Sequence, residues 1–366
     1  MINIYELALA KTYGIGYKTA KQALTTFHSA EAIFNENKKG LETVFGSKNR
    51  TINEILNKKM FPQCESELEF MKKYEINGYF FLNDDYPQRL KHIDDPPICL
   101  FYQGNADINS KKSVAIVGSR KVTEYGKNVT NALVEYLSKY EVSINSGLAY
   151  GIDAYAHKAA LFKNLPTFGV LAHGLDMIYP RDNFDLAQKM KTNGGLITEH
   201  FSKTKINPNF FPSRNRIIAG LSDLVIVVEA AYKSGALITA RLAREYNREV
   251  IAISGKLNDE YSKGCNLLIR NNIAQIMTDF SDIDLVMNWD TDSQNQQSIK
   301  FIPPTLQNTE TPEYKIYKTI IDNAGINIDD LAIKTNFTST QLSFALLDLE
   351  MNNLITTLPG KRFKAI

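Results

Sequence analysis

Between residues 113 and 270 the sequence repeats one unit, a short apolar run that ends in a turn and is followed by a segment with helical spacing. The first unit is SVAIVG followed by GKNVTNALVEYLSKY, and the second is VSINSG followed by IDAYAHKAALF. Further runs rich in valine, isoleucine and leucine follow in PTFGVLA, GGLITEH, DLVIVVEA and REVIAIS. Continuous apolar strands that alternate with helices indicate a parallel sheet covered on both faces. We therefore predict an α/β fold with a central Rossmann-like, doubly wound parallel sheet.

The segments on either side of this sheet differ in kind. Residues 1–75 carry apolar positions at helical spacing, which predicts an all-helical domain of the SAM-like or helix-hairpin-helix type. The irregular lead-in with Pro96 and Pro97, and the short strand ICLFYQG, are grouped with the Rossmann-like domain over residues 76–290. Residues 291–312 are polar and predict a linker, and residues 313–366 predict three helices and a hairpin, which is a winged helix.

The Gly14-Ile15-Gly16 turn in the first domain allows two interpretations. A tight glycine turn at a helix N-terminus exposes backbone N–H groups that hold a DNA phosphate in helix-hairpin-helix modules. A helix–helix turn that needs glycine for its backbone angles would have the same sequence. The residues alone leave both open.

Composition excludes several classes of protein. The hydrophobic fraction of 44% and the charged fraction of 22% are typical of a soluble globular protein. No apolar run approaches the roughly 20 residues needed to cross a bilayer, and the N-terminus does not resemble a signal peptide. The three cysteines are far apart and odd in number, so neither a disulfide framework nor a zinc site is expected. We expect a cytoplasmic protein without a membrane partner.

Positive charge is concentrated in the middle of the chain. The net charge is only +2, but residues 113–270 hold 20 Lys and Arg against 14 Asp and Glu. An anionic partner is therefore expected at the Rossmann-like domain.

A search for catalytic residues gives no convincing set. The five histidines show no metal-ligand spacing, and GSRKVTEYG is not the GxGxxG dinucleotide fingerprint. Asp153 and His157 are four residues apart on one helical face. They form either an oriented general base or a helix-stabilising polar pair. We predict no catalytic residues, no metal and no cofactor.

The ends of the predicted strands instead offer groups that hold anions. Ligands of such sheets bind beyond the carboxyl ends of the strands. Hydroxyl, glycine and cationic residues follow three of the strands, and three further arginines add forked donors for phosphate oxygens. Of Phe210 and Phe211, we expect one ring to fill the core and the other to stack on a base. The predicted set for binding single-stranded DNA is Gly118, Ser119, Arg120, Ser146, Gly147, Arg181, Phe211, Arg214, Arg216, Lys233, Ser234 and Gly235.

The predicted recognition helix of the winged module, STQLSFALLDLEMNNL, contains Asp348 and Glu350 and no lysine or arginine. A duplex-reading helix is usually basic. We therefore expect this module to contact protein, or to touch DNA weakly through its wing.

Seven stretches together resemble the DprA/Smf family of DNA-processing proteins. They are YPQRLKHIDDPPICLFYQGN, VAIVGSRKVTEYG, SGLAYGIDAYAHKAAL, GLDMIYPRDN, FPSRNRIIAGLSDLVIVVEA, KSGALITARLAREYNREV and GCNLLIRNNIAQI, and the C-terminal tail resembles the family's winged module. The resemblance implies a cytosolic bacterial protein that binds and protects single-stranded DNA during natural transformation and helps to load RecA. It also implies a homodimer without catalytic activity, whose DNA contacts run through the Rossmann-like domain, and it adds Asn215 to the predicted binding set.

One alternative belongs to a different class, the Rossmann-like nucleotide-processing enzymes of the nucleoside-monophosphate phosphoribohydrolase type. These carry a glycine-rich loop and a catalytic glutamate on the helix that follows. At the comparable place this chain has SGALITARLAREY, with no glutamate before Glu245. The missing glutamate counts against hydrolysis.

Overall fold

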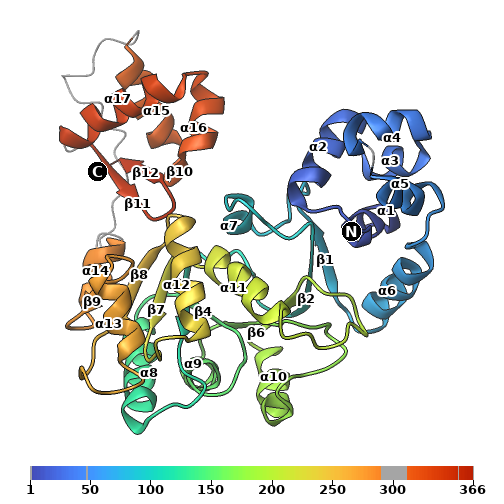
Figure 1. The fold of residues 1–366 in the computed structure, drawn as a ribbon. Helices are drawn as coiled ribbons and strands as arrows, with labels where there is room; N and C mark the ends of the chain where they lie inside the picture. The colour runs from blue at the N-terminus through green and yellow to red at the C-terminus, as the bar shows by residue number, and fades with distance from the viewer. Residues whose placement is uncertain (1, 47, 290–310, 353, 366) are drawn as a thin grey trace. The chain divides into compact units, whose positions relative to one another are not determined.

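A computed structural model describes residues 2–46, 48–289, 311–352 and 354–365. The chain divides into two compact units (Figure 1). The first comprises Met1–Tyr246 and Val250–Ile276, and the second Asn247–Glu249 and Met277–Ile366. The predicted linker, residues 291–312, falls outside the described residues except for its last two positions.

A nine-stranded sheet with the order β1-β2-β6-β5-β4-β3-β7-β8-β9 forms the centre of the fold. Neighbouring strands from β6 through β7 pair in parallel, which confirms the predicted sheet. At one edge β1 and β2 add antiparallel pairs, and β2 is the strand predicted from ICLFYQG. The strands are β1 (Asn77–Phe80), β2 (Cys99–Gly104), β3 (Lys112–Val117), β4 (Val142–Ser146), β5 (Thr167–Val170), β6 (Gly194–Thr198), β7 (Leu224–Val227), β8 (Glu249–Ile253) and β9 (Gln275–Met277).

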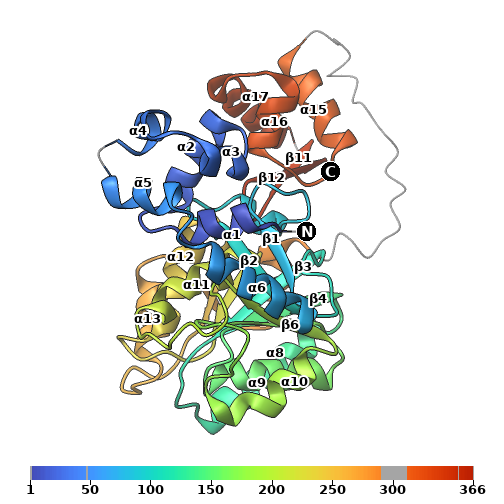
Figure 2. The same cartoon turned by 90° about the vertical axis from the view of Figure 1, so that its right-hand side faces the viewer.

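Helices cover both faces of this sheet, as a doubly wound fold requires (Figure 2). On one face α8 packs on α9 and α9 on α10, and on the other α11 packs on α12 and α12 on α13. These helices are α8 (Glu124–Leu137), α9 (Ile152–Phe162), α10 (Phe184–Met190), α11 (Phe210–Leu221), α12 (Gly235–Glu245) and α13 (Lys263–Arg270). A 3-10 turn, η1 (Arg181–Asn183), precedes α10. Because both faces are covered, the residues of strands β4 to β7 are buried without alternation.

The N-terminal residues are helical, as predicted, and pack on the antiparallel edge of the sheet. The Cys99 thiol of β2 lies 3.5 Å from the carbonyl oxygen of Glu6, and Glu67 accepts the Ser202 N–H. Gly14 has a φ of +76°, and a Cβ there would lie 2.9 Å from Thr51 Oγ1. The helices are α1 (Ile4–Lys11), α2 (Tyr17–Phe27), α3 (Ala30–Asn35), α4 (Lys38–Phe45), α5 (Asn49–Leu56) and α6 (Phe61–Lys73), followed after β1 by α7 (Gln88–Lys91).

The second unit contains the predicted winged helix. Its helices bury a separate apolar core that includes Ile316, Leu331 and Leu349. The wing is an antiparallel hairpin, and a short strand completes a sheet with the order β10-β12-β11. After α14 (Asp282–Met287), the elements are α15 (Pro312–Asp322), β10 (Ile326–Asn327), α16 (Ile328–Thr335), α17 (Ser339–Met351), β11 (Ile355–Leu358) and β12 (Arg362–Ala365). Among the described residues, no helix is long and apolar enough to cross a membrane.

Candidate functional site

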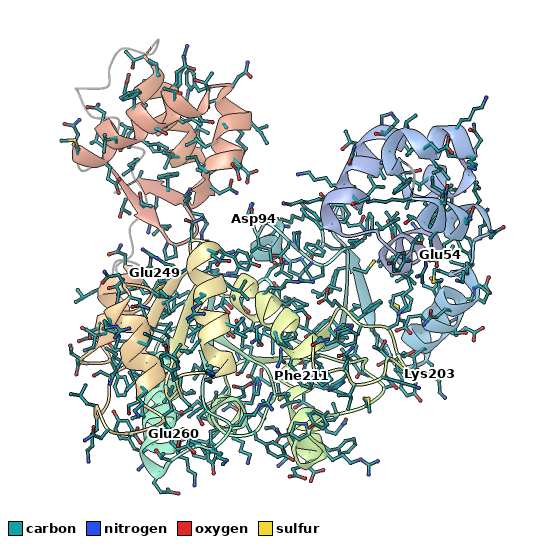
Figure 3. The ribbon with its side chains drawn as sticks, viewed as in Figure 1. Glu54, Asp94, Lys203, Phe211, Glu249 and Glu260 are labelled. Carbon is teal, nitrogen blue, oxygen red and sulfur yellow. The ribbon has the colours of Figure 1, made fainter. Side chains whose placement is uncertain are left out.

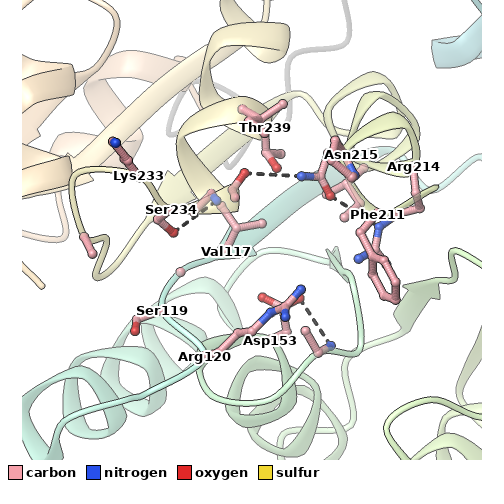
Figure 4. A pocket seen from close by; sticks show the side chains of 18 of the residues that line it. Val117, Ser119, Arg120, Asp153, Phe211, Arg214, Asn215, Lys233, Ser234 and Thr239 are labelled. Carbon is pink, nitrogen blue, oxygen red and sulfur yellow. Dashed lines mark hydrogen bonds between the residues drawn. The ribbon is translucent and has the colours of Figure 1, made fainter. Parts of the chain in front are cut away.

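A cavity of about 680 Å³ opens at the carboxyl ends of β3 and β7, where ligands of parallel sheets bind (Figure 4). Its walls come from the loop after β3, the loop after β4, one face of α11, and the segment from β7 into α12. Phe211 of α11 and Glu260 of the loop after β8, both labelled in Figure 3, also belong to the lining. Predicted site residues in the lining are Gly118, Ser119, Arg120, Phe211, Arg214, Asn215, Lys233, Ser234 and Gly235.

The segment FPSRNRIIAG is part of helix α11, and helical geometry separates its two arginines. Each residue turns the helix by about 100°, so Phe211, Arg214 and Asn215 face the cavity while Arg216 points about 200° away from Arg214. The Arg216 guanidinium pairs with Glu199, and its Nε lies 3.8 Å from an oxygen of Asp95. Arg216, which the sequence analysis grouped with Arg214 as a residue that binds the strand, therefore lies outside this cavity.

Arg216 lines a second cavity, of about 340 Å³, between the helical N-terminal region and the edge of the sheet. Gly16 and Tyr17, at the start of α2, are also in its lining. Glu199 and Asp95 are carboxylates in the same lining, so the charge of Arg216 is already countered there.

Arg214 is buried, with 5% of its surface exposed. It donates to the carbonyl oxygens of Gly147, at 2.7 Å, and Val170. Burial lowers the pKa of its guanidinium to about 10, against the opposing attraction of Asp153. Arg214 thus joins the ends of β4 and β5 and belongs to the floor of the cavity.

The positions after β4 hold a carboxylate of the protein itself. The N–H groups of Gly147 and Ala149 lie 3.0 and 3.4 Å from Asp153 Oδ2. Ser146 is fully buried and donates its hydroxyl to the carbonyl of Ile116 at 2.7 Å. Ser146 and Gly147 belong to the predicted DNA-binding set, but they are absent from the lining of the cavity, and Asp153 occupies the N–H groups after β4.

The suggested pair of Asp153 and His157 does not form a catalytic unit. His157 Nδ1 lies 2.7 Å from Thr167 Oγ1, and the ring is fully buried. Burial lowers the pKa of His157 to about 3, so the ring is neutral in the core. Within the described residues, no group of three or more His, Cys, Asp or Glu could hold a metal ion.

Glu229 fills a second anion position, at the N-terminus of α8. Its carboxylate accepts the N–H of Thr123, at 3.1 Å, and the Thr123 hydroxyl. A Cβ added to Gly126 would lie only 2.4 Å from Glu229 Oε2. In nucleotide-binding Rossmann domains the pyrophosphate lies at the N-terminus of the helix after the first strand. Here an internal carboxylate takes that place.

Three cations of the cavity remain exposed: Arg120, Lys121 and Lys233. Arg120 makes no hydrogen bond or ion pair with any other described residue, and its Cζ lies 5.8 Å from the centre of the Phe211 ring. Ser234 caps α12 by accepting the Ala236 N–H, and the space beside Gly235 is open. The cavity therefore combines accessible positive charge with the N-terminus of α12, which also favours anions.

The two phenylalanines have different surroundings. Phe210 stacks on His200 with ring centres 4.4 Å apart. Phe211 lines the cavity, with the ring of Tyr179 edge-on at 5.9 Å. Phe211 is thus the ring that a base could reach.

Arg181 is exposed in η1, two residues after Tyr179, and is not in the lining of the cavity. Sequence reasoning missed Tyr179 and Lys121 as lining residues. Both could have been found from the sequence. Tyr179 is an aromatic residue directly before a proline, as is Phe211, and Lys121 directly follows Arg120.

Two family models match the chain. The model described as DNA recombination-mediator protein A matches residues 78–288, and the DprA winged helix domain matches residues 303–361. The protein Smf of Synechocystis is 31% identical over 98% of this chain and 98% of its own length. The DNA processing protein DprA of Bacillus subtilis is 42% identical over 61% of this chain and 75% of its own.

Two solved structures are similar to this fold. The X-ray structure of DNA processing protein A from Streptococcus pneumoniae has a TM-score of 0.68 and 32% identity, covering 77% of this chain and 97% of its own. DNA processing protein A from Helicobacter pylori, described for its single-stranded DNA binding mode, has a TM-score of 0.52 and 30% identity. It covers 57% of this chain and 94% of its own.

Proposed function

The chain belongs to the DNA recombination-mediator protein A family, also called DprA or Smf, and on that premise we propose that it binds single-stranded DNA in the cavity beyond β3 and β7. The strand's phosphates pair with Arg120, Lys121 and Lys233, and one base stacks on Phe211. Phosphate pairing beside an aromatic platform is how single strands are held without sequence preference.

One observation carries this proposal: exposed cations lie on separate segments of the cavity wall, whereas Glu229 and Asp153 fill the compact anion positions at the start of α8 and after β4. A mononucleotide needs such a compact position for its phosphate. A strand, in contrast, presents phosphates along its length and can meet separated cations. The single-stranded DNA binding described for the Helicobacter pylori protein supports the same assignment.

The finer parts of the function are also proposals. The protein acts as a recombination mediator that protects incoming strands during natural transformation and helps to load RecA, in line with the description of its family. It works as a homodimer in the cytoplasm. Its parts are a helical domain (1–75), the strand-binding Rossmann-like domain (76–290), a linker (291–312) and a winged helix (313–366).

We also propose that the protein is not an enzyme. His157 is neutral and bonded inside the core, and Glu229 and Asp153 accept backbone N–H groups of the chain itself. None of these groups is left to activate a water molecule against a nucleoside monophosphate. The rival hydrolase would carry its base on the helix after the glycine-rich loop, where α12 has no glutamate before Glu245. The Glu260 carboxylate in the cavity lining lies instead on the loop after β8.

Arg120→Ala tests the proposed site, because Arg120 is exposed and makes no hydrogen bond or ion pair with a described residue that its loss would break. Anisotropy of a labelled oligothymidine over a series of salt concentrations gives the affinity and its salt dependence. We expect about tenfold weaker binding and a log–log salt slope smaller by roughly 0.7 to 1, since one phosphate contact is lost. Lys189→Ala, on α10, removes one exposed charge outside the cavity and should bind like the wild type. Equal affinity and slope in Arg120→Ala and the wild type would refute the site.

A further inference from the structure

We propose that the bound strand leaves the cavity across a shelf made of Tyr179, Arg181 and Tyr150, with Tyr179 and Tyr150 as successive stacking platforms. The inference rests on the proposed function and extends it, because it assigns a path to the strand beyond the cavity. Below, "the shelf" means the exposed faces of these three residues.

The shelf begins inside the cavity. Tyr179 lines the cavity, and its ring lies edge-on to Phe211 with centres 5.9 Å apart. A base on Phe211 would therefore have a second ring beside it. Arg181 follows two residues later and is exposed, so a cation lies next to the second platform.

The segment that carries Tyr179 is fixed to the loop after β4, which carries Tyr150. Asn183 donates to the carbonyls of Leu148, at 2.9 Å, and Ala149, at 3.2 Å. The hydroxyl of Tyr150 lies 3.1 Å from Asp182 Oδ2. Two segments distant in the sequence thus form one continuous rim, and the cavity-lining Ala149 directly precedes Tyr150.

Tyr150 is exposed on the loop after β4, and this loop packs closely against the loop after β3. Gly151 has a φ of +76°, and a Cβ there would lie 2.1 Å from the carbonyl oxygen of Ser119, so only glycine fits. The chain therefore turns sharply at Gly151, and Tyr150 remains 45% exposed, as is Tyr179. Both rings keep an accessible face while their backbone is held, which reduces the entropy lost when a base stacks on them.

Two exposed tyrosines on a rim could instead meet a partner protein. The contiguity with the cationic cavity and the presence of Arg181 favour the strand. A track for single strands combines stacking rings with cations, and Phe211, Tyr179, Arg181 and Tyr150 provide both.

Oligothymidines of increasing length test the shelf by anisotropy. A strand just long enough for the cavity should bind the wild type and Tyr150→Ala alike, whereas longer strands should bind Tyr150→Ala about tenfold more weakly. Tyr150→Phe keeps the ring and should retain wild-type affinity at every length. Phe162→Ala removes a ring that is 81% exposed at the far end of α9, and should change nothing.

The outcomes separate the two proposals. If the wild type binds strands but Tyr150→Ala matches it at all lengths, or weakens the shortest strand equally, the shelf is refuted. If the wild type binds no strand of any length, the proposed function itself fails. Photocrosslinking of a strand that carries 5-iodouracil to the wild-type protein adds a test that needs no variant. Crosslinks at Tyr150 support the shelf, and crosslinks confined to the residues that line the cavity, Tyr179 included, contradict it.

Discussion

Removing the buried cation Arg214 should destabilise the first unit strongly, in contrast to the loss of an exposed arginine. In Arg214→Met the carbonyl oxygens of Gly147 and Val170 lose a donor, and the buried Asp153 loses the attraction that counters its desolvation. An acceptor left buried without a partner costs about 1–3 kcal/mol, and breaking a buried charge pair costs about 3–5 kcal/mol in total. We therefore expect the free energy of unfolding of this unit to fall by about 3–5 kcal/mol.

Tryptophan fluorescence would report on the second unit, because Trp289, the only tryptophan, lies there. The measurement must therefore follow the first unit by other means. Amide hydrogen exchange of β4 and β5, combined with urea unfolding by far-UV circular dichroism, does so. Arg241→Met, on the exposed side of α12, should cost less than about 0.5 kcal/mol and serves as the matched control. Adding Asp153→Asn to Arg214→Met should cost less than the sum of the two single changes, because both remove the same attraction.

The pH dependence of stability is a second test of the structural role of Arg214. Burial raises the pKa of Asp153, and without Arg214 that pKa should rise further. A raised pKa in the folded state means that the ionised form destabilises the fold at neutral pH, and that protonation relieves this as the pH falls through the folded pKa. The stability difference between Arg214→Met and the wild type should therefore shrink in acid. A loss below about 1 kcal/mol at pH 7, or full additivity with Asp153→Asn, would refute the assignment of Arg214 as a structural cation.

Arg216→Ala should leave strand affinity unchanged in the anisotropy assay, because Arg216 lies in the second cavity; a loss like that of Arg120→Ala would contradict the helical separation. Glu229→Ala removes the acceptor of the Thr123 N–H and should cost about 1–2 kcal/mol, while inorganic phosphate should raise the melting temperature of this variant more than that of the wild type. A phosphate effect equal in both proteins would argue against an anion position at α8. Burial lowers the pKa of His157 to about 3, so below pH ~6.5 the unfolded chain binds a proton that the folded chain does not. The free energy of unfolding should therefore decrease as the pH is lowered. His157→Gln should reduce that slope in urea titrations between pH 6.5 and 4, to which His200, with a pKa lowered to about 4 by burial, also contributes. An unchanged slope would show that His157 does not contribute to it.

The sheet and its ligand-binding edge could be predicted because they depend on local patterns. Each strand is a short apolar run between glycine or polar turns, and parallel strands bring their carboxyl ends to one edge. The cavity lies there and contains Gly118, Arg120 and Lys233, as expected. The winged helix was likewise recognisable from helical spacing and a Pro359-Gly360 turn.

What the pattern could not predict was which polar groups are already satisfied. The Asp153 carboxylate lies six residues from Gly147, and Glu229 lies 106 residues from Thr123, so only the folded chain brings these pairs together. The direction of Arg216 was missed for a simpler reason. FPSRNRIIAG was not assigned to a helix, although Phe211, Arg214, Asn215 and Ile218 recur at helical spacing.

The carboxylates of Glu229 and Asp153 also determine how this surface distinguishes ligands. With the anion positions at the start of α8 and after β4 filled from within, each exposed cation of the cavity offers a free phosphate only a weak, solvent-screened contact. Once one phosphate of a chain is bound, however, the covalent link holds the next at a high effective concentration near the next cation. The fold that elsewhere grips one nucleotide tightly thereby becomes selective for polymers by avidity, and its affinity should rise with the number of linked phosphates rather than with the quality of any single contact.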